Sequence, residues 1–241
     1  MDKIPEGDIK EKSPFLQWLD NYWYHYKMQT IVVLVALFVI IVCVLQTCTH
    51  SESYDMSVLY SGRCGLTQNE ASELSGVLRL ALSEDYNGDG KKTVELAKYH
   101  VMSEEQMRQM ASETHEDSMP VYVDRNFYAK EYENYSNMLV TGEYSVCMLD
   151  PWLYEKLASA GRLKKLSEVL TAVPDGAVGD YGVSLGSTGL YKYYDAMRVL
   201  PEDTVVCLMQ PYVIGKSSRE EHYSRCIEMF RNIVEFKSRD M

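Results

Sequence analysis

The sequence predicts an α/β domain with a mixed, mainly parallel sheet, joined to a single N-terminal transmembrane helix. Two observations lead to this prediction. No charged residue occurs from Met28 to Thr49, and these 22 positions match the roughly 20 residues that cross a hydrocarbon core. Downstream, short apolar runs of strand length alternate with segments of helical periodicity, as in sheets whose strands are joined by helices.

The chain is expected to have four parts. These are a cytoplasmic N-terminal segment with an interfacial aromatic helix (1–27), a transmembrane helix (28–49), a linker (50–55) and an extracytoplasmic α/β domain (56–241). Lys10, Lys12 and Lys27 precede the span, and Arg63 is the only basic residue within about 20 residues after it. This bias predicts a single-pass protein of the cell membrane, with the N-terminus cytoplasmic and the C-terminal domain extracellular.

The tract FLQWLDNYWYHYK (15–27), directly before the span, is rich in Trp and Tyr, which favour the membrane interface. An uncleaved anchor fits better than a cleaved signal peptide, because five acidic residues precede the apolar run and no small-x-small site follows. Lipidation at Cys48 is disfavoured, since Leu45, Gln46 and Thr47 are not the small residues expected before a lipidated cysteine.

Charge and cysteine content exclude several classes of function. The net charge of −11 and the lack of a long basic run argue against a nucleic-acid partner. Four of the six cysteines follow the linker, too few for a disulfide scaffold, and no CxxC or Cys/His cluster suggests zinc. Cys147 and Cys207 lie in apolar runs and are expected to be buried thiols.

The predicted elements follow from periodicity and from helix caps. Strands are expected at 56–62, 93–102, 144–151, 182–186, 190–194 and 204–210, and helices at 67–84, 103–110, 126–141, 151–161 and 217–237, with a short segment at 162–170 and a loop at 174–182. Thr67 and Glu70 form a capping box, and Ser103 caps the second helix. Pro151 and Gly161 delimit the fourth helix.

Ligands of such sheets bind beyond the carboxyl ends of the strands. The candidate ligand-binding residues are therefore those that follow the strands: Ser61, Asp150, Trp152 and Ser187. For Asp150, which precedes Pro151, a helix-capping role is the alternative. The tyrosines of 127–135 and 190–195 are candidates for stacking on sugars or peptides, and packing at the sheet edge is the alternative.

The tract YSVCMLDPWLYEKLASAGRLKKLSEVL resembles a segment of bacterial extracellular solute-binding proteins, which have the type 2 periplasmic-binding fold. The order MSVLYSG, helix, TVELAKYHV is similar to the opening β-α-β unit of that fold. The tract TVVCLMQ and the helix after it resemble its late strand and final helix. The resemblance implies a reduced periplasmic-binding-like domain, since about 190 residues are few for two full lobes.

The stretch SEDYNGDGKK (83–92) has part of the spacing of a calcium loop. Asp85, Asn87, Asp89 and Thr93 would supply oxygen ligands, but Leu96 stands where a bidentate Glu is needed. The acidic stretch 113–117 is one source of a missing oxygen. The site is a candidate for weak Ca²⁺ binding, the only cofactor expected, and a turn built from Asn and Gly is the alternative.

The sequence indicates no enzyme. The letters G-V-S-L-G place Ser184 in a G-x-S-x-G pattern, but no helix-like pattern follows as a nucleophile elbow requires, and His222 is its only suggested partner.

Two functions are then open. One is a membrane-tethered binding module, like a solute-binding protein, that senses or presents a small molecule, peptide or partner at the cell surface. The other is a non-catalytic structural or assembly protein of the envelope that has lost its ligand site and binds a membrane protein.

Overall fold

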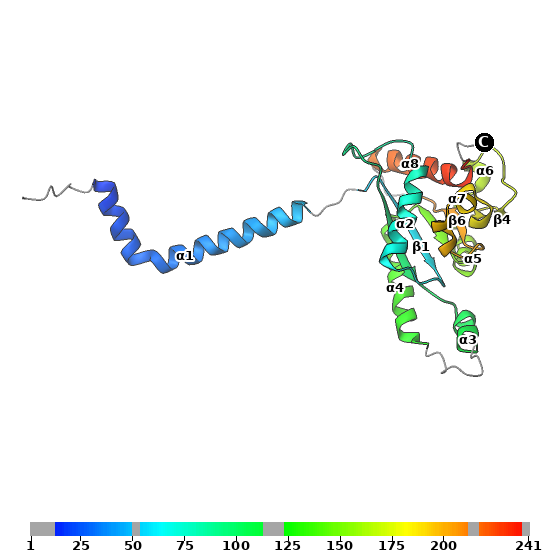
Figure 1. The fold of residues 1–241 in the computed structure, drawn as a ribbon, viewed down its shortest axis with the longest axis horizontal. Helices are drawn as coiled ribbons and strands as arrows, with labels where there is room; N and C mark the ends of the chain where they lie inside the picture. The colour runs from blue at the N-terminus through cyan, green and yellow to red at the C-terminus, as the bar shows by residue number, and fades with distance from the viewer. Residues whose placement is uncertain (1–12, 50–53, 113–122, 212–216, 238–241) are drawn as a thin grey trace, which may run out of the picture. The chain divides into compact units, whose positions relative to one another are not determined.

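The computed structural model describes residues 13–49, 54–112, 123–211 and 217–237 (Figure 1). The chain forms two compact units, Met1–Ser53 and Tyr54–Met241. The acidic stretch 113–117 and the greater part of the linker, residues 50–53, lie outside the described residues.

The first unit contains one helix, α1 (Pro14–Thr49), which combines the aromatic tract with the apolar tract. Its segment Asn21–Cys43 has a mean hydropathy of 2.3 and no buried share, so it is long and apolar enough to span a membrane. This segment overlaps the predicted span 28–49. Figure 1 shows a bend in α1 between a short N-terminal arm and the longer remainder.

The second unit is built on one mixed sheet of six strands in the order β2-β1-β3-β6-β5-β4. The strands are β1 (Met56–Gly62), β2 (Val94–His100), β3 (Val146–Leu149), β4 (Ala177–Val178), β5 (Gly182–Ser184) and β6 (Val205–Leu208). Strand β1 pairs in parallel with β2 and β3, but β3–β6, β6–β5 and β5–β4 are antiparallel. The prediction of a mixed sheet is confirmed. The prediction that it is mainly parallel is wrong, because β6 runs back along β3.

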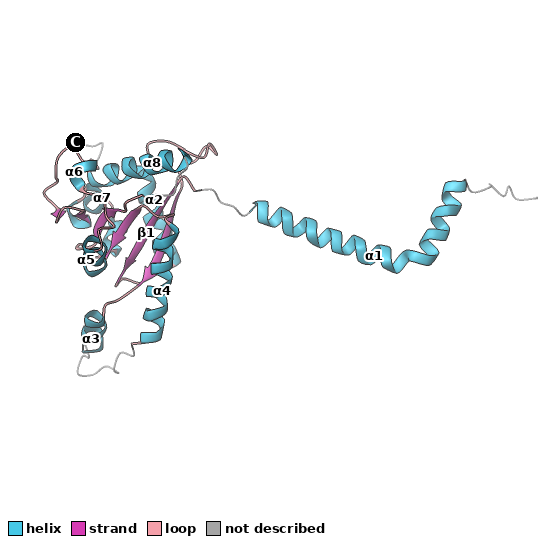
Figure 2. Cartoon of the chain, turned by 180° about the vertical axis from the view of Figure 1, so that it is seen from behind, coloured by secondary structure: helices cyan, strands magenta, loops and turns pink. Residues whose placement is uncertain are grey.

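Helices cover both faces of the sheet, as Figure 2 shows around the magenta strands. The helices described in this unit are α2 (Gln68–Leu78), α3 (Glu104–Ser112), α4 (Arg125–Thr141), α5 (Pro151–Ser159), α6 (Leu166–Val169), α7 (Gly189–Tyr193) and α8 (Ser217–Val234), with short 3-10 helices at Arg79–Ala81, Leu185–Ser187 and Asp195–Val199. The central strands β1, β3 and β6 are buried along nearly their whole length, so they need helices on both faces of the sheet.

Alternate side chains of the strands enter two different cores. Val58 and Tyr60 of β1 pack in a core with α2, α7 and α8, whereas Leu59 enters a second core with α4 and α5. Cys147 and Cys207 oppose each other on β3 and β6 and are both buried in the second core, as the sequence predicts. The period-two alternation of a strand therefore places consecutive residues under different helices.

The capping signals read from the sequence are confirmed. The Thr67 hydroxyl accepts from the Glu70 N–H, and the Glu70 carboxylate accepts from the Thr67 N–H, which completes the capping box. Helix α5 begins with Pro151, and Gly161 follows its end with a φ of 63°.

The prediction from the sequence is wrong for one strand and omits another. Residues 190–194 form most of helix α7 instead of a strand, because the Thr188 hydroxyl caps the Tyr191 N–H and starts a helical turn. Strand β4 lies within the predicted loop 174–182. It forms because Gly179, at a φ of 58°, lets the chain turn back so that Val178 pairs with Gly182.

We expect two Gly→Ala substitutions to have opposite effects on stability. A Cβ at Gly189 would overlap the backbone carbonyl of Phe236, so Gly189→Ala should lower the free energy of unfolding by about 1–3 kcal/mol. Gly76 in α2 has open space around it, so Gly76→Ala should raise that free energy by up to about 1 kcal/mol. Urea denaturation of the two variants measures both values, and equal effects would contradict the packing around α7.

Candidate functional site

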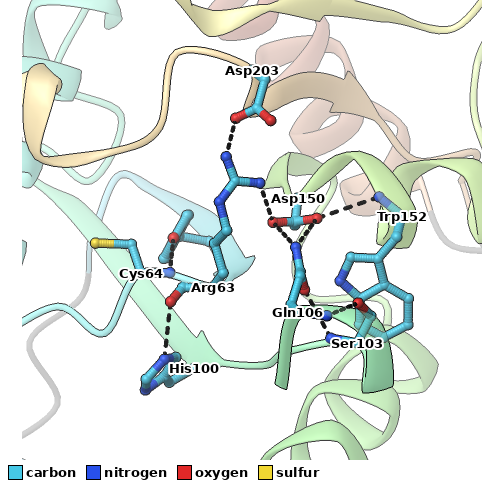
Figure 3. A network of polar contacts seen from close by, with 9 residues as sticks. Arg63, Cys64, His100, Ser103, Gln106, Asp150, Trp152 and Asp203 are labelled. Carbon is cyan, nitrogen blue, oxygen red and sulfur yellow. Dashed lines mark hydrogen bonds and ion pairs between the residues drawn. The ribbon is translucent and has the colours of Figure 1, made fainter. Parts of the chain in front are cut away.

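Four strands bring their ends to one edge of the sheet. The carboxyl ends of β1 and β2 meet because Gly62 pairs with His100, and β3 ends beside them because Ser61 pairs with Leu149. Strand β6 is antiparallel, so its amino end arrives at the same edge, where Leu149 pairs with Val205. The polar residues just outside this edge form the edge cluster: Arg63, Gln106, Asp150 and Asp203 (Figure 3).

Asp150 is the centre of the edge cluster. It is only 4 % exposed, and its carboxylate accepts bonds from Arg63 Nη1 at 3.0 Å and from Gln106 Nε2 at 3.0 and 3.1 Å. It also caps α5 through the Trp152 N–H, and its own N–H donates to the Ser61 carbonyl at 2.9 Å. A buried carboxylate needs such partners, because an unpaired charge in the interior is strongly destabilising.

Arg63 connects Asp150 to the loop before β6. Its second guanidinium nitrogen, Nη2, donates to Asp203 at 2.6 Å, so one cation lies between two carboxylates. Burial alone would lower the pKa of Arg63, but the bonds to Asp203 and Asp150 raise it above its ordinary value. The Arg63 carbonyl in turn contacts His100 Nε2 at 3.0 Å, which holds the turn after β1 against the end of β2.

The side-chain amide of Gln106 makes hydrogen bonds through both its oxygen and its nitrogen. Its Oε1 accepts from the Ser103 N–H at 2.8 Å, which completes a capping box for α3, and its Nε2 donates to Asp150. The N-terminal turn of α3 is therefore attached to the same carboxylate as the N-terminal turn of α5.

An aromatic groove of about 480 Å³ lies beside the edge cluster, between α3, α4 and α5. Its lining includes Trp152, Tyr132, Lys156, Tyr128 and Met107. The Trp152 and Tyr132 rings are stacked with their centroids 6.1 Å apart. Lys156 Nζ lies 4.6 Å from the Trp152 ring centroid and 5.0 Å from that of Tyr132, within the range of cation–π attraction. The groove thus presents flat ring faces beside a positive charge.

Three buried polar atoms have no hydrogen-bond partner within the described parts of the chain: Ser61 Oγ, Tyr135 Oη and Trp152 Nε1. Tyr135 and Trp152 belong to the second core, and Ser61 points to the same face of β1 as Leu59. The face of the sheet beneath α4 and α5 therefore has polar groups left unsatisfied, which is costly unless something pairs with them.

The structure brings together three of the four predicted ligand-binding residues. Ser61, Asp150 and Trp152 adjoin one another at the sheet edge, but Ser61 is fully buried and Asp150 is the α5 cap. Trp152 is the one of the three that lines an open groove. Ser187 is separate: its hydroxyl donates to the Ser184 carbonyl, and no bond joins it to the edge cluster among the described residues.

The serine of the G-x-S-x-G pattern is bonded to backbone. Ser184 ends β5, and its hydroxyl donates to the Glu202 carbonyl at 2.9 Å. His222 lies on α8 and lines a different cleft, together with Tyr223 and Gln210. Burial lowers the pKa of His222 below its ordinary value, and nearby Arg225 lowers it further.

The NGDG loop is organised by Asp55, a residue to which the sequence analysis assigns no role. One Asp55 oxygen accepts from the Tyr86 and Asn87 N–H groups at 2.7 and 2.9 Å, and the other accepts from the Thr93 N–H at 2.7 Å. Burial alone would raise the pKa of Asp55, but these backbone bonds outweigh it and lower the pKa below 3.8. The loop is therefore fixed to the start of β1.

The four predicted calcium ligands lie in this loop or directly after it. The Asp85 carboxylate accepts from the N–H groups of Gly88 and Gly90, and Asp89 accepts from that of Lys91. Gly88 and Gly90 have φ values of 75° and 85°, as the turn requires. Within the described residues, no group of three or more His, Cys, Asp and Glu is placed to hold a metal ion. Calcium binding stays a prediction, because each carboxylate oxygen can accept a further bond.

Sequence reasoning missed Arg63, Gln106 and Asp203. Arg63 stands one residue beyond the strand end, and Gln106 is visible as a capping partner of Ser103 but not as a partner of Asp150. Asp203 precedes its strand, so only the antiparallel direction of β6 brings it to this edge.

Comparison with known proteins found no matching family model, no similar curated protein and no similar solved structure. The chain's chemistry must therefore be argued from its own residues.

We expect Asp150 and Asp203 to differ in their contribution to stability. Asp150→Ala removes the α5 cap and leaves Arg63 and Gln106 without their buried partner, so the free energy of unfolding should fall by about 2 kcal/mol. Asp203→Ala removes a carboxylate that is itself 52 % exposed and should lower the free energy of unfolding by less than about 1 kcal/mol. Urea denaturation compares them, and equal losses would contradict the central position of Asp150.

We also expect an acid-dependent contribution from Asp55. Because its folded-state pKa is lowered, it stabilises the fold above pH 3.8, and this stabilisation is lost as the pH falls through the folded value. Asp55→Asn should lower the free energy of unfolding by about 1–3 kcal/mol at neutral pH. The difference between the two proteins should shrink as the pH falls below 3.8, and a constant difference would contradict the bonding described.

Proposed function

We propose that this protein is a membrane-tethered binding module, anchored by α1, whose extracytoplasmic domain holds a small ligand or peptide side chain in the aromatic groove. The observation that carries the proposal is the stacked pair of Trp152 and Tyr132 with Lys156 over both rings, open on one side. In this proposal the N-terminus is cytoplasmic and the C-terminal domain is extracellular. The domain is a reduced form of a solute-binding protein, with a single groove in place of a cleft between two lobes.

The groove has the features of a site for a ligand with a flat, apolar face. Ring faces give large contact area with little loss of side-chain freedom, because stacking already restricts Tyr132 and Trp152. The helices that carry these rings are held in place, because Asp150 caps the start of α5 and Tyr135 packs α4 against the sheet. Lys156 lies beside the rings, and Glu104, Glu105 and Arg125 also line the groove, so its charges are of both signs and suit a ligand with polar groups around a flat face.

Two observations favour the alternative, a non-catalytic assembly protein. Asp150, the buried carboxylate of the edge cluster, is engaged by Arg63, Gln106 and the α5 cap. In addition, the side chains of Phe15, Trp18, Tyr22 and Tyr26 form a continuous exposed stack along α1, which suits contact with a membrane protein.

Two substitutions at Trp152 test the groove. Trp152→Ala removes the stacking surface, and Trp152→Phe keeps a ring but removes an indole N–H that is buried and unpartnered. The full chain, in a neutral detergent, would be screened by thermal shift against oligosaccharides, aromatic amino acids and short peptides containing Phe or Trp. At least one probe should raise the Tm of the native chain, as a ligand of the folded state does.

Binding of that probe should be lost in Trp152→Ala and largely kept in Trp152→Phe. Without ligand, Trp152→Phe should leave the Tm unchanged or higher, because it removes an unsatisfied buried donor. If no probe shifts the native Tm, or if Trp152→Ala binds as well as the native chain, the groove is not a ligand site and the assembly role gains support.

A further inference from the structure

A second cleft, of about 870 Å³, lies at the opposite, amino-terminal edge of the sheet. We name it the basic cleft, because the described residues that line it include four cationic side chains and no carboxylate: Arg79, Lys91, Lys92 and Lys237. The whole chain has 35 acidic and 24 basic residues, so four cations without an acid among the described lining residues are a local reversal of the protein's charge. Such a reversal in a concave surface attracts anions.

The positive surface continues beyond the basic cleft. An adjoining hollow of about 470 Å³ shares Arg79, Lys92 and Thr93 with it and adds Lys98. Among the described residues that line that hollow, Glu95 is the one acid, and its carboxylate already accepts bonds from the Ser57 and Tyr144 hydroxyls.

The cations of the basic cleft differ in the hydrogen bonds and ion pairs that they already make. Lys92 Nζ donates to the carbonyls of Leu82 and Ser83 at 2.8 and 2.6 Å, so one of its three N–H groups is left for a ligand. Arg79, Lys91 and Lys237 are exposed and have no ion pair with any described carboxylate.

Part of the lining is apolar. Tyr194 and Phe236 meet edge to face with their ring centroids 5.9 Å apart, and Leu80 and Leu82 line the same cleft. A ligand that combines a phosphate with an apolar portion would satisfy both parts of this surface.

The basic cleft adjoins the point where the chain enters the domain. Thr93, in its lining, accepts from the Asp55 N–H through its carbonyl and donates its own N–H to the Asp55 carboxylate, and Tyr54 lines the adjoining hollow. Between Thr49, the end of α1, and Tyr54 there are only five peptide steps, which reach no further than about 18 Å. The covalent length of this connection thus limits how far Tyr54 can lie from the end of α1.

We propose that the basic cleft binds the phosphate of an anionic phospholipid headgroup and so docks the domain on its own membrane. The inference rests on α1 as an anchor and is independent of the aromatic groove. Basic residues near an anionic surface are attracted strongly enough that each changes the docked-to-undocked ratio about fivefold. The attraction acts only within about 10 Å at ordinary ionic strength, a distance that the short linker permits.

The test is amide hydrogen exchange on the full chain in nanodiscs of phosphatidylcholine, alone or mixed with phosphatidylglycerol. Amides of 79–94 should be more protected in the anionic nanodiscs, and added salt should reduce the difference. The double variant Arg79→Glu/Lys91→Glu should lose the difference. The matched control Arg108→Glu/Lys130→Glu, with the same charge change on α3 and α4, should keep it.

Other outcomes overturn the proposal. Equal protection in both kinds of nanodisc, or loss of the difference in the control variant as well, would show that the basic cleft does not bind lipid. Equal protection by inorganic phosphate in phosphatidylcholine nanodiscs would assign the cleft to a soluble anion. If the double variant fails to fold, Lys237→Gln, beyond the end of α8, should reduce the difference by itself about fivefold.

Discussion

The Asp150 carboxylate is the interaction on which the order of the sheet edge depends. Through its backbone N–H it extends the pairing of β3 with β1, through its side chain it starts α5, and through Gln106 it holds the first turn of α3. Arg63 then links it to Asp203 before β6. One buried charge therefore positions two of the three helices that form the aromatic groove, α3 and α5, and the partners that make its burial tolerable are the groups that build the edge.

The two ends of the sheet have different chemistry. At the carboxyl edge, charges pair with one another and leave aromatic faces open, which suits a ligand that is recognised by shape and stacking. At the amino edge, the Asp55 carboxylate accepts hydrogen bonds from backbone N–H groups, and the described lining of the basic cleft has cations without a carboxylate, which suits an anionic ligand.

Local patterns of the sequence predicted the elements well where a nearby residue determines them. The capping box of Thr67, the Pro151 start of α5 and the apolar tract of α1 depend on residues within a turn or on composition alone. Residues 190–194 were misjudged because alternating Tyr and Lys fit a strand as well as a helix, and the Thr188 cap decided between them. Of the site, Ser61, Asp150 and Trp152 were predicted, since they follow strands directly.

The sequence by itself determined that an α/β domain follows an apolar helix long enough to span a membrane, because period and hydropathy are properties of neighbouring residues. Only the tertiary structure decided that β6 is antiparallel, that Asp203 and Gln106 reach Asp150, and that Arg79, Lys91 and Lys237 line one cleft. These residues are separated by tens of positions along the chain. Their contacts depend on which strands pair and in which direction, and no local propensity contains that information.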